Sequence, residues 1–179
     1  MDIILETDRL LIKTWEKSDI TIMSQINADP KVMEYFPSIL SRDETIWLIG
    51  RFHQHYIDFG YTMYPILLKS SHQLIGFTGL LMVNYFKSSF TPAIEIGWRI
   101  SSEHWGKGYA PEAAKAILNN AQEIINPETN EIISFTTEGN SKSRRVMEKI
   151  GMRYDGDLNH PTISDTSPLK KHVVYKIRI

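Results

Sequence analysis

The sequence of 179 residues contains no cysteine. Disulfide bonds, thiolate metal sites and a cysteine nucleophile are therefore excluded. The chain also lacks any apolar run approaching about 18 residues, so no segment is expected to span a membrane. Its first nine residues contain Asp2, Glu6 and Asp8 and no long apolar core, which is unlike a secretory signal. Together these absences favour a cytoplasmic protein.

The sequence contains 20 Lys and Arg residues and 21 Asp and Glu residues, so its formal net charge is only −1 and neither sign is in excess. Such a balance provides no field that would attract nucleic acid or an anionic membrane, and neither is expected as a partner. With 42% hydrophobic and 23% charged residues, the composition is typical of a globular protein. No repeat or Pro/Ser/Gly-rich linker divides the chain, so we expect one domain over 1–179.

Hydrophobic periodicity and turn residues predict a mixture of strands and helices. Ser41 and Glu44 form a capping-box pattern, and Gly60 ends the helix that follows. Apolar residues spaced at three and four over 110–125 predict a helix with one buried stripe. Strands are expected at 10–15, 61–69, 74–83, 93–100, 131–137, 152–157 and 172–179, and helices at 20–28, 41–59, 110–125 and 141–150. This order indicates an α+β or mixed α/β fold with a central, largely antiparallel sheet flanked by helices.

The segment Trp105-Gly106-Lys107-Gly108-Tyr109-Ala110 lies between a predicted strand and the helix over 110–125. Glycines allow successive backbone N–H groups to turn inward, and a helix start adds unpaired N–H groups with partial positive charge. The pattern therefore indicates an anion cradle suited to a phosphate or pyrophosphate, although a tight turn alone would also explain it. A P-loop and a dinucleotide fingerprint are both disfavoured, since the required Gly-Lys-Ser/Thr and third glycine are missing.

Three spaced motifs resemble the GNAT superfamily of N-acetyltransferases. The segment 105–110 is similar to the family's acetyl-CoA loop, with Trp105 where many members have Arg or Gln, as is usual in the branch of ribosomal-protein N-terminal (Rim-type) acetyltransferases. Glu95-Ile96-Gly97-Trp98-Arg99-Ile100 resembles the preceding strand, and 140–152 resembles the next helical motif. The resemblance implies a V-shaped splay between the strands 93–100 and 131–137, with acetyl-CoA as co-substrate and no metal. It assigns acetyl-CoA binding to Trp98, Arg99, Ile100, Trp105, Gly106, Lys107, Gly108, Tyr109, Ala110, Asn140 and Ser143.

The same resemblance implies that an amine attacks the thioester directly in a ternary complex. Glu95 is the first candidate for the general base, although an exposed or salt-bridged strand carboxylate is the alternative. Ser143 is expected to protonate the departing thiolate, with a helix N-terminal cap as its alternative. Asn140 is either a cap or a pantetheine contact, and the two roles are compatible.

The acceptor is expected to be a primary amine, either a protein N-terminus or a small molecule, and the protein a monomer or homodimer. His160 is a weaker candidate for the acceptor site, and no spacing of His160 and His172 suggests a metal site. Tyr154 is expected to be a core aromatic rather than a general acid. A catalytically silent acyl-CoA sensor is the alternative function, and the presence of Glu95 and Ser143 favours the enzyme.

Overall fold

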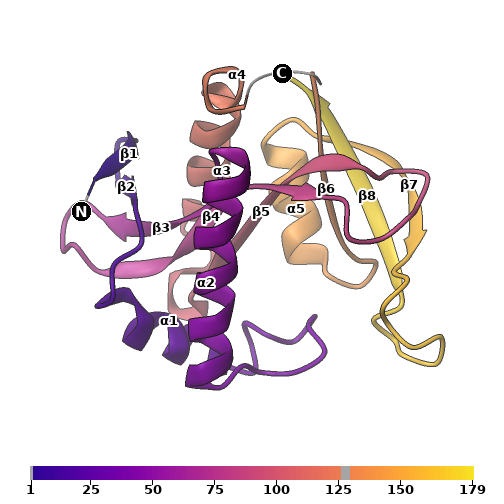
Figure 1. The fold of residues 1–179 in the computed structure, drawn as a ribbon, viewed down its shortest axis with the longest axis horizontal. Helices are drawn as coiled ribbons and strands as arrows, with labels where there is room; N and C mark the ends of the chain where they lie inside the picture. Colours follow the sequence, from indigo (N-terminus) through magenta and orange to yellow (C-terminus); the bar gives the residue numbers. More distant parts are fainter. Residues whose placement is uncertain (1, 126–129) are drawn as a thin grey trace.

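The computed structural model describes residues 2–125 and 130–179. Within them, eight strands form one sheet in the order β1-β2-β3-β4-β5-β6-β8-β7, with every neighbouring pair antiparallel except β5 and β6 (Figure 1). The strands are β1 Ile3–Glu6, β2 Leu10–Lys13, β3 Met63–Leu68, β4 Leu74–Val83, β5 Ala93–Ile100, β6 Glu131–Thr137, β7 Arg153–Asn159 and β8 Lys171–Arg178. The predicted mixed α/β fold with a largely antiparallel sheet is confirmed.

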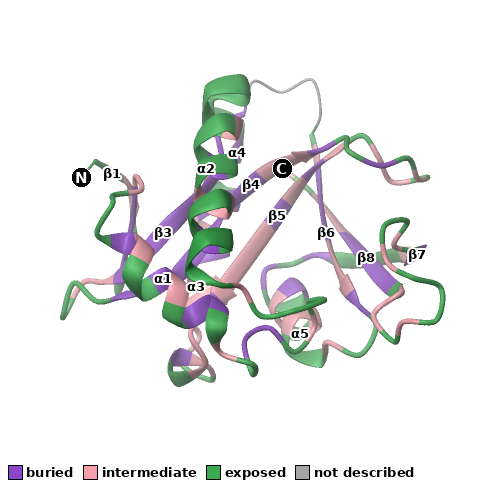
Figure 2. Cartoon of the chain, turned by 60° about the horizontal axis from the view of Figure 1, so that its bottom comes forward, coloured by how far each residue is buried: buried purple, intermediate pink, exposed green. Residues whose placement is uncertain are grey.

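Helices cover both faces of this sheet. They are α1 Asp19–Ala28, α2 Arg42–Phe59, α3 Tyr109–Asn119, α4 Ala121–Ile124 and α5 Ser141–Lys149. Met23 of α1 and Phe52 of α2 share a core cluster with Leu67 and Phe77 of the sheet. A separate cluster on the opposite face contains residues of α3 and α5. In Figure 2, α2 is exposed along most of its length, so only one stripe of it packs on the sheet. No helix in these described segments has the length and hydropathy needed to cross a bilayer.

Local signals located two helix ends correctly. Ser41 and Glu44 form the predicted capping box, and Gly60 ends α2 in the left-handed region with φ of 81°. The helix predicted over 110–125 begins one residue earlier and breaks at Asn120, whose side-chain amide donates to the carbonyl of Ala116. Because α4 continues in nearly the same register, Ala121 still lies in the buried stripe.

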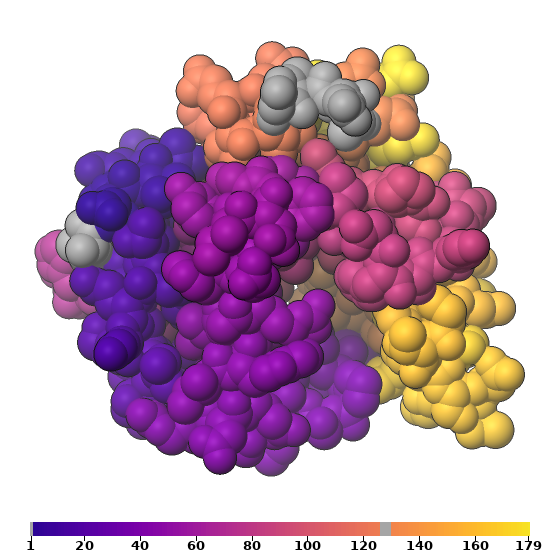
Figure 3. Space-filling view, viewed as in Figure 1, coloured from indigo at the N-terminus to yellow at the C-terminus, as the bar shows by residue number. Residues whose placement is uncertain are grey.

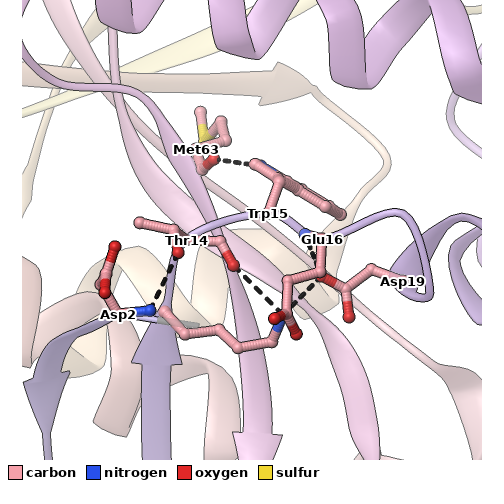
Figure 4. Close-up of polar contacts among 7 residues, drawn as sticks. Asp2, Thr14, Trp15, Glu16, Asp19 and Met63 are labelled. Carbon is pink, nitrogen blue, oxygen red and sulfur yellow. Dashed lines mark hydrogen bonds and ion pairs between the residues drawn. The ribbon is translucent and has the colours of Figure 1, made fainter.

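The N-terminal edge of the sheet differs from the prediction. β1 was not expected, and it pairs with β2 through a tight connection at residues 7–9. The strand predicted over 10–15 ends at Lys13, because the indole Nε1 of Trp15 turns away to donate to the carbonyl of Met63 at 2.7 Å (Figure 4). In the same region, one carboxylate oxygen of Asp19 accepts from the backbone N–H of Glu16 at 2.8 Å and binds the buried ammonium of Lys13. This ion pair fixes α1 to the end of β2.

The parallel pair β5–β6 determines where a ligand can enter. Its register contains only Ile94 opposite Ile132 and Glu95 opposite Ile133, although β5 continues to Ile100. Beyond Glu95 the two strands separate, which confirms the predicted V-shaped splay. Since β5 pairs with β4 on its other side, its backbone groups that point toward β6 are left without a strand partner after Glu95.

Candidate active site

The splay of β5 and β6 opens a cleft of about 790 Å³, here called the β5–β6 cleft. One wall comes from β5 and the loop that leads into α3, and the other comes from β6 and α5. Residues 31–37 between α1 and α2 and the segment between β7 and β8 close its outer part. In Figure 3 the surface is hollowed where the purple α1–α2 region faces the orange and yellow C-terminal segments. The cleft is long enough to bring together a cofactor arm and a second substrate.

The glycine loop lies at one end of this cleft. Gly106 and Gly108 have φ of 76° and 81°, a left-handed conformation that strongly favours glycine. Gly108 precedes the first turn of α3, and no side chain in the described part of the chain caps the backbone N–H groups there. A helix start without a cap, together with two glycines that turn the backbone inward, provides donors for a pyrophosphate. The predicted cradle is therefore sterically and electrostatically suited to one.

A clamp from the N-terminal hairpin holds this loop. Arg9 donates from Nε to the Glu112 carboxylate at 2.7 Å and from Nη1 to the carbonyl of Lys107 at 2.9 Å. Its guanidinium also lies 4.6 Å from the ring centre of Tyr109. Burial would raise the pKa of Glu112, but hydrogen bonds from Thr7 and Arg9 outweigh it and lower the pKa. Glu112 thus binds the hairpin as well as complementing the α3 dipole.

Trp105 joins the two walls of the cleft. Its Nε1 donates to the carbonyl of Ile100 at 2.8 Å, and the Nζ of Lys142 in α5 lies 4.1 Å from its ring centre. The residue where many family members have Arg or Gln therefore supports the loop through a cation–π contact and a hydrogen bond. Unlike Gly106 and Gly108, Lys107 does not line the cleft.

Glu95 lies at the vertex of the splay, where it is the last β5 residue still paired with β6. Its side chain lines the cleft and forms no ion pair or hydrogen bond with another described residue, so it is not the salt-bridged carboxylate of the alternative. Burial raises the pKa of Glu95 to about 8. Tyr85 also lines the cleft, and its pKa is raised to about 12 by burial and by the nearby charge of Glu95.

The start of α5 contributes Asn140 and Ser143. Asn140 caps the helix by accepting from the backbone N–H of Ser143 at 3.1 Å, and its amide donates to Thr136 at 2.9 Å. The Ser143 hydroxyl lines the cleft and has no hydrogen-bond partner within residues 2–125 and 130–179. Because Asn140 already caps α5, the hydroxyl of Ser143 remains available to a ligand.

Alternate residues of β5 face different sides of the sheet. Trp98 packs on the cluster that includes α3, and Ile100 is buried in it. The Arg99 side chain points the other way, where its Nη1 donates to Asn27 of α1 at 2.6 Å. All three residues line the cleft. Their binding of acetyl-CoA stays a prediction, and for Arg99 it would use the backbone, because the side chain points away.

The sequence analysis missed Tyr85 and Phe135 as cleft residues, placed Tyr154 wrongly, and named His160, which the structure does place in the cleft. Phe135 of β6 and Tyr85 of the β4–β5 loop line the cleft but belong to no local motif. The rings of His160 and His172 both line it as well, and their centres are 5.0 Å apart. Burial lowers the pKa of both histidines. Tyr154, expected in the core, is 55% exposed on β7 and donates to Asp157, because its strand is at the sheet edge.

Comparisons with known proteins agree with this geometry. A family model described as an acetyltransferase (GNAT) domain matches residues 9–153. The chain belongs to the GNAT acetyltransferase family. A Bacillus subtilis (strain 168) protein named as the N-acetyltransferase YnaD is 31% identical over 153 residues, covering 85% of this chain and 84% of the relative. The GNAT enzyme described here is therefore an acyltransferase.

Solved structures share the whole fold with this GNAT enzyme. An acetyltransferase of the GNAT family from Bacillus anthracis matches with a TM-score of 0.77 at 27% identity, covering 99% of this chain and 98% of the other. RimL, a ribosomal L7/L12 α-N-protein acetyltransferase solved with coenzyme A, has a TM-score of 0.78 at 15% identity, with coverage of 99% and 98%. A Vibrio cholerae spermidine N-acetyltransferase, solved with CoA and spermine, matches with a TM-score of 0.73 at 21% identity and 96% coverage of each chain. The last two likenesses show the fold alone.

Proposed function

We propose that this enzyme transfers an acetyl group from acetyl-CoA to a primary amine by direct attack in a ternary complex. The acceptor is a protein N-terminal α-amine or a small-molecule amine. The observation that carries the proposal is the placement of three features in one cleft: the glycine loop, the vertex residue Glu95 and the unpaired hydroxyl of Ser143. Structural neighbours that were solved with CoA support the same use of the cleft.

The unpaired edge of β5 supplies the positioning. Backbone groups of residues 96–100 that face the splay have no strand partner, so they can hydrogen-bond the pantetheine arm and a developing oxyanion. Holding the thioester beside the amine contributes roughly 7–11 kcal/mol to lowering the barrier. The glycine loop anchors the pyrophosphate and thereby sets how far the arm reaches toward Glu95.

Proton transfer follows from the two side chains at the cleft. As the amine nitrogen bonds to the thioester carbon, Glu95 accepts the proton that the nitrogen releases. The carbon–sulfur bond breaks, and the Ser143 hydroxyl donates a proton to the departing sulfur and regains one from solvent. A carboxyl with a pKa of about 8 is a stronger base when ionised than an ordinary one, and this pKa is close to that of an α-amine, about 8.

Two measurements test this function. Titration calorimetry is expected to show acetyl-CoA binding by the wild-type protein and loss of binding by Gly108→Trp. Any side chain at φ of 81° is strained, and an added Cβ would lie 3.4 Å from the Nη2 of Arg9, which holds the loop. Gly50→Trp is the matched control, since the space around Gly50 in α2 is open. Normal binding by Gly108→Trp would show that the cradle is elsewhere.

A thiol-release screen with acetyl-CoA then addresses the acceptor. Alkyl amines, polyamines, aminoglycosides and N-terminal peptides cover the expected classes. Turnover with at least one class, lowered in Glu95→Gln while acetyl-CoA affinity is kept, supports the mechanism. Binding of acetyl-CoA without turnover of any amine would instead identify an acyl-CoA sensor.

A further inference from the structure

Two charged residues of β5 face the side of the sheet that carries α1 and α2. Ile94, Ile96 and Ile100 belong to the core cluster on the opposite face, so the alternating residues Glu95 and Arg99 share the α1–α2 side. Both line the β5–β6 cleft. Their four-residue separation corresponds to about 13 Å between the Cα atoms at ~3.3 Å per strand residue.

Arg99 is a half-buried cation without a counterion among the residues that the structure describes. Its guanidinium carbon lies 4.4 Å from the ring centre of Phe36 and 5.3 Å from that of Phe77. Nη1 donates to the neutral amide oxygen of Asn27, and Nε is buried without a hydrogen-bond partner. No described carboxylate forms an ion pair with it, although burial is strong enough to lower its pKa to about 10.

Desolvation of the Arg99 guanidinium is unfavourable unless a ligand supplies the missing hydrogen bonds and the counter-charge. A buried charge needs a partner to offset its lost hydration, and Asn27 and two aromatic rings provide only part of that compensation. Nη2 has no hydrogen bond to a described residue and, unlike Nε, is not fully buried, so it is accessible in the cleft that Arg99 lines. On the α1–α2 side the cleft therefore presents the half-buried guanidinium of Arg99, which has no ion pair with a described residue, whereas Lys31 on the same side is exposed.

Among the described residues, no other charged residue that lines the cleft is placed like Arg99 to bind an anionic group. Lys31 and Glu34 come from the same α1–α2 loop and have opposite signs. The remaining cations, Lys142, Arg145 and Lys149, belong to α5 on the other wall. Burial favours the neutral forms of the three cleft histidines, His104, His160 and His172.

We propose that the acceptor amine carries a carboxylate, which binds Arg99 while the amine lies at Glu95. This inference rests on the proposed acetyltransferase function and narrows its acceptor class. Because the two residues are separated along the strand, the carboxylate lies several bonds from the reactive nitrogen. With the two Cα atoms about 13 Å apart, an α-amino acid, whose carboxylate is adjacent to the amine carbon, is expected to be a poorer acceptor than a longer amino acid.

The test compares ω-amino acids with their amides, which differ only in the charge at the far end. For 4-aminobutanoate, 6-aminohexanoate and 8-aminooctanoate, acetylation by the wild-type enzyme is expected to favour the acid over its amide. The expected preference in kcat/KM is about tenfold to hundredfold for the best chain length, as for a hydrogen bond to a charged group. Equal rates for acids and amides in the wild-type enzyme would overturn the proposal without any variant.

Variants separate binding of a carboxylate from a structural role. Arg99→Gln is expected to raise KM for the acids, leave KM for the amides nearly unchanged and remove the preference. Arg42→Gln is the matched control, because Arg42 lies outside the cleft and contacts Thr21 of α1. An equal loss for acids and amides in Arg99→Gln, with acetyl-CoA binding retained, would show that Arg99 only supports α1. If no amine of any kind is acetylated, the proposed function fails rather than this inference alone.

Discussion

At the scale of single residues, the buried carboxyl of Glu95 makes both activity and stability depend on pH. Its pKa is raised from 4.5 to about 8 by burial. Turnover is therefore expected to rise with an apparent pKa near 8 as Glu95 ionises, and Glu95→Gln is expected to lose this limb of the profile. Steady-state rates between pH 6 and 9.5 measure the effect, with Glu138→Gln, a carboxylate outside the cleft, as the control. An unchanged limb in Glu95→Gln would assign the titration to the amine.

The same shift has a definite sign for stability. Between pH 4.5 and about 8 the folded protein keeps the Glu95 proton, whereas the unfolded chain releases it. The folded state thus binds more protons in this window, and the contribution of Glu95 to the unfolding free energy falls as pH rises. Denaturant unfolding at pH 5 and pH 9 should show a smaller decline for Glu95→Gln than for the wild-type protein.

Whether a site residue could be predicted depended on how local its signal is. Gly106 and Gly108 were identifiable because left-handed φ values favour glycine wherever they occur. Glu95 and Ser143 were found through motifs of neighbouring residues. The direction of Arg99, by contrast, depends on contacts with Asn27 and Phe36, which are distant in the sequence. No sequence pattern at residue 99 encodes such contacts.

At the scale of elements, the two glycines of α2 provide a matched pair. A Cβ at Gly50 or Gly60 would meet no atom within 4 Å, but only Gly60 has a positive φ, of 81°. Gly50→Ala is expected to raise the unfolding free energy by about 0.5–1 kcal/mol, because alanine has the higher helix propensity. Gly60→Ala is expected to lower it by about 1 kcal/mol or more, because alanine is strained in the left-handed region.

Chemical denaturation of both variants measures the difference. Since neither substitution creates a contact within this distance, opposite signs isolate the backbone conformation as the cause. A stabilising Gly60→Ala would contradict the left-handed cap. A destabilising Gly50→Ala would contradict helix propensity as the dominant effect at this exposed position.

Helix and strand boundaries were predicted where their causes are local in sequence and were missed where the causes are distant. The capping box and Gly60 fixed α2 from the sequence, since their hydrogen bonds lie within the helix ends. The end of β2 was missed because Trp15 leaves the strand to bond the carbonyl of Met63, 48 residues away. β1 was missed because its four residues become a strand only through pairing with β2.

At the scale of the whole molecule, the cleft exists because segments far apart in sequence meet at one point. β5 and β6 pair at only two positions, and α3 and α4 separate them along the chain. The splay was expected from a resemblance to a family, since no local periodicity specifies how many residues of a parallel pair remain in register. The cleft geometry that places Glu95 at its vertex is thus a property of the assembled sheet.

The assembly of β2 with α1 depends on a buried ion pair whose removal has a predictable cost. The side chains of Lys13 and Asp19 are only 2% and 7% exposed. Asp19→Ala leaves the ammonium of Lys13 buried with a partly exposed Glu16 at 3.4 Å as its nearest remaining carboxylate. The unfolding free energy is expected to fall by about 3–5 kcal/mol, the usual cost of removing one partner of a buried pair.

The double variant Lys13→Met/Asp19→Leu separates the charge from the packing. It removes both charges and keeps apolar volume, so most of the lost stability is expected to return. Denaturant unfolding of Lys13→Met, Asp19→Leu and the double variant forms a thermodynamic cycle that gives the coupling energy of the pair. Additive losses would mean that Lys13 reaches water when Asp19 is absent. A strongly positive coupling would instead show that the pair itself holds α1 against the sheet, and with α1 the residues 31–37 that close the outer part of the cleft.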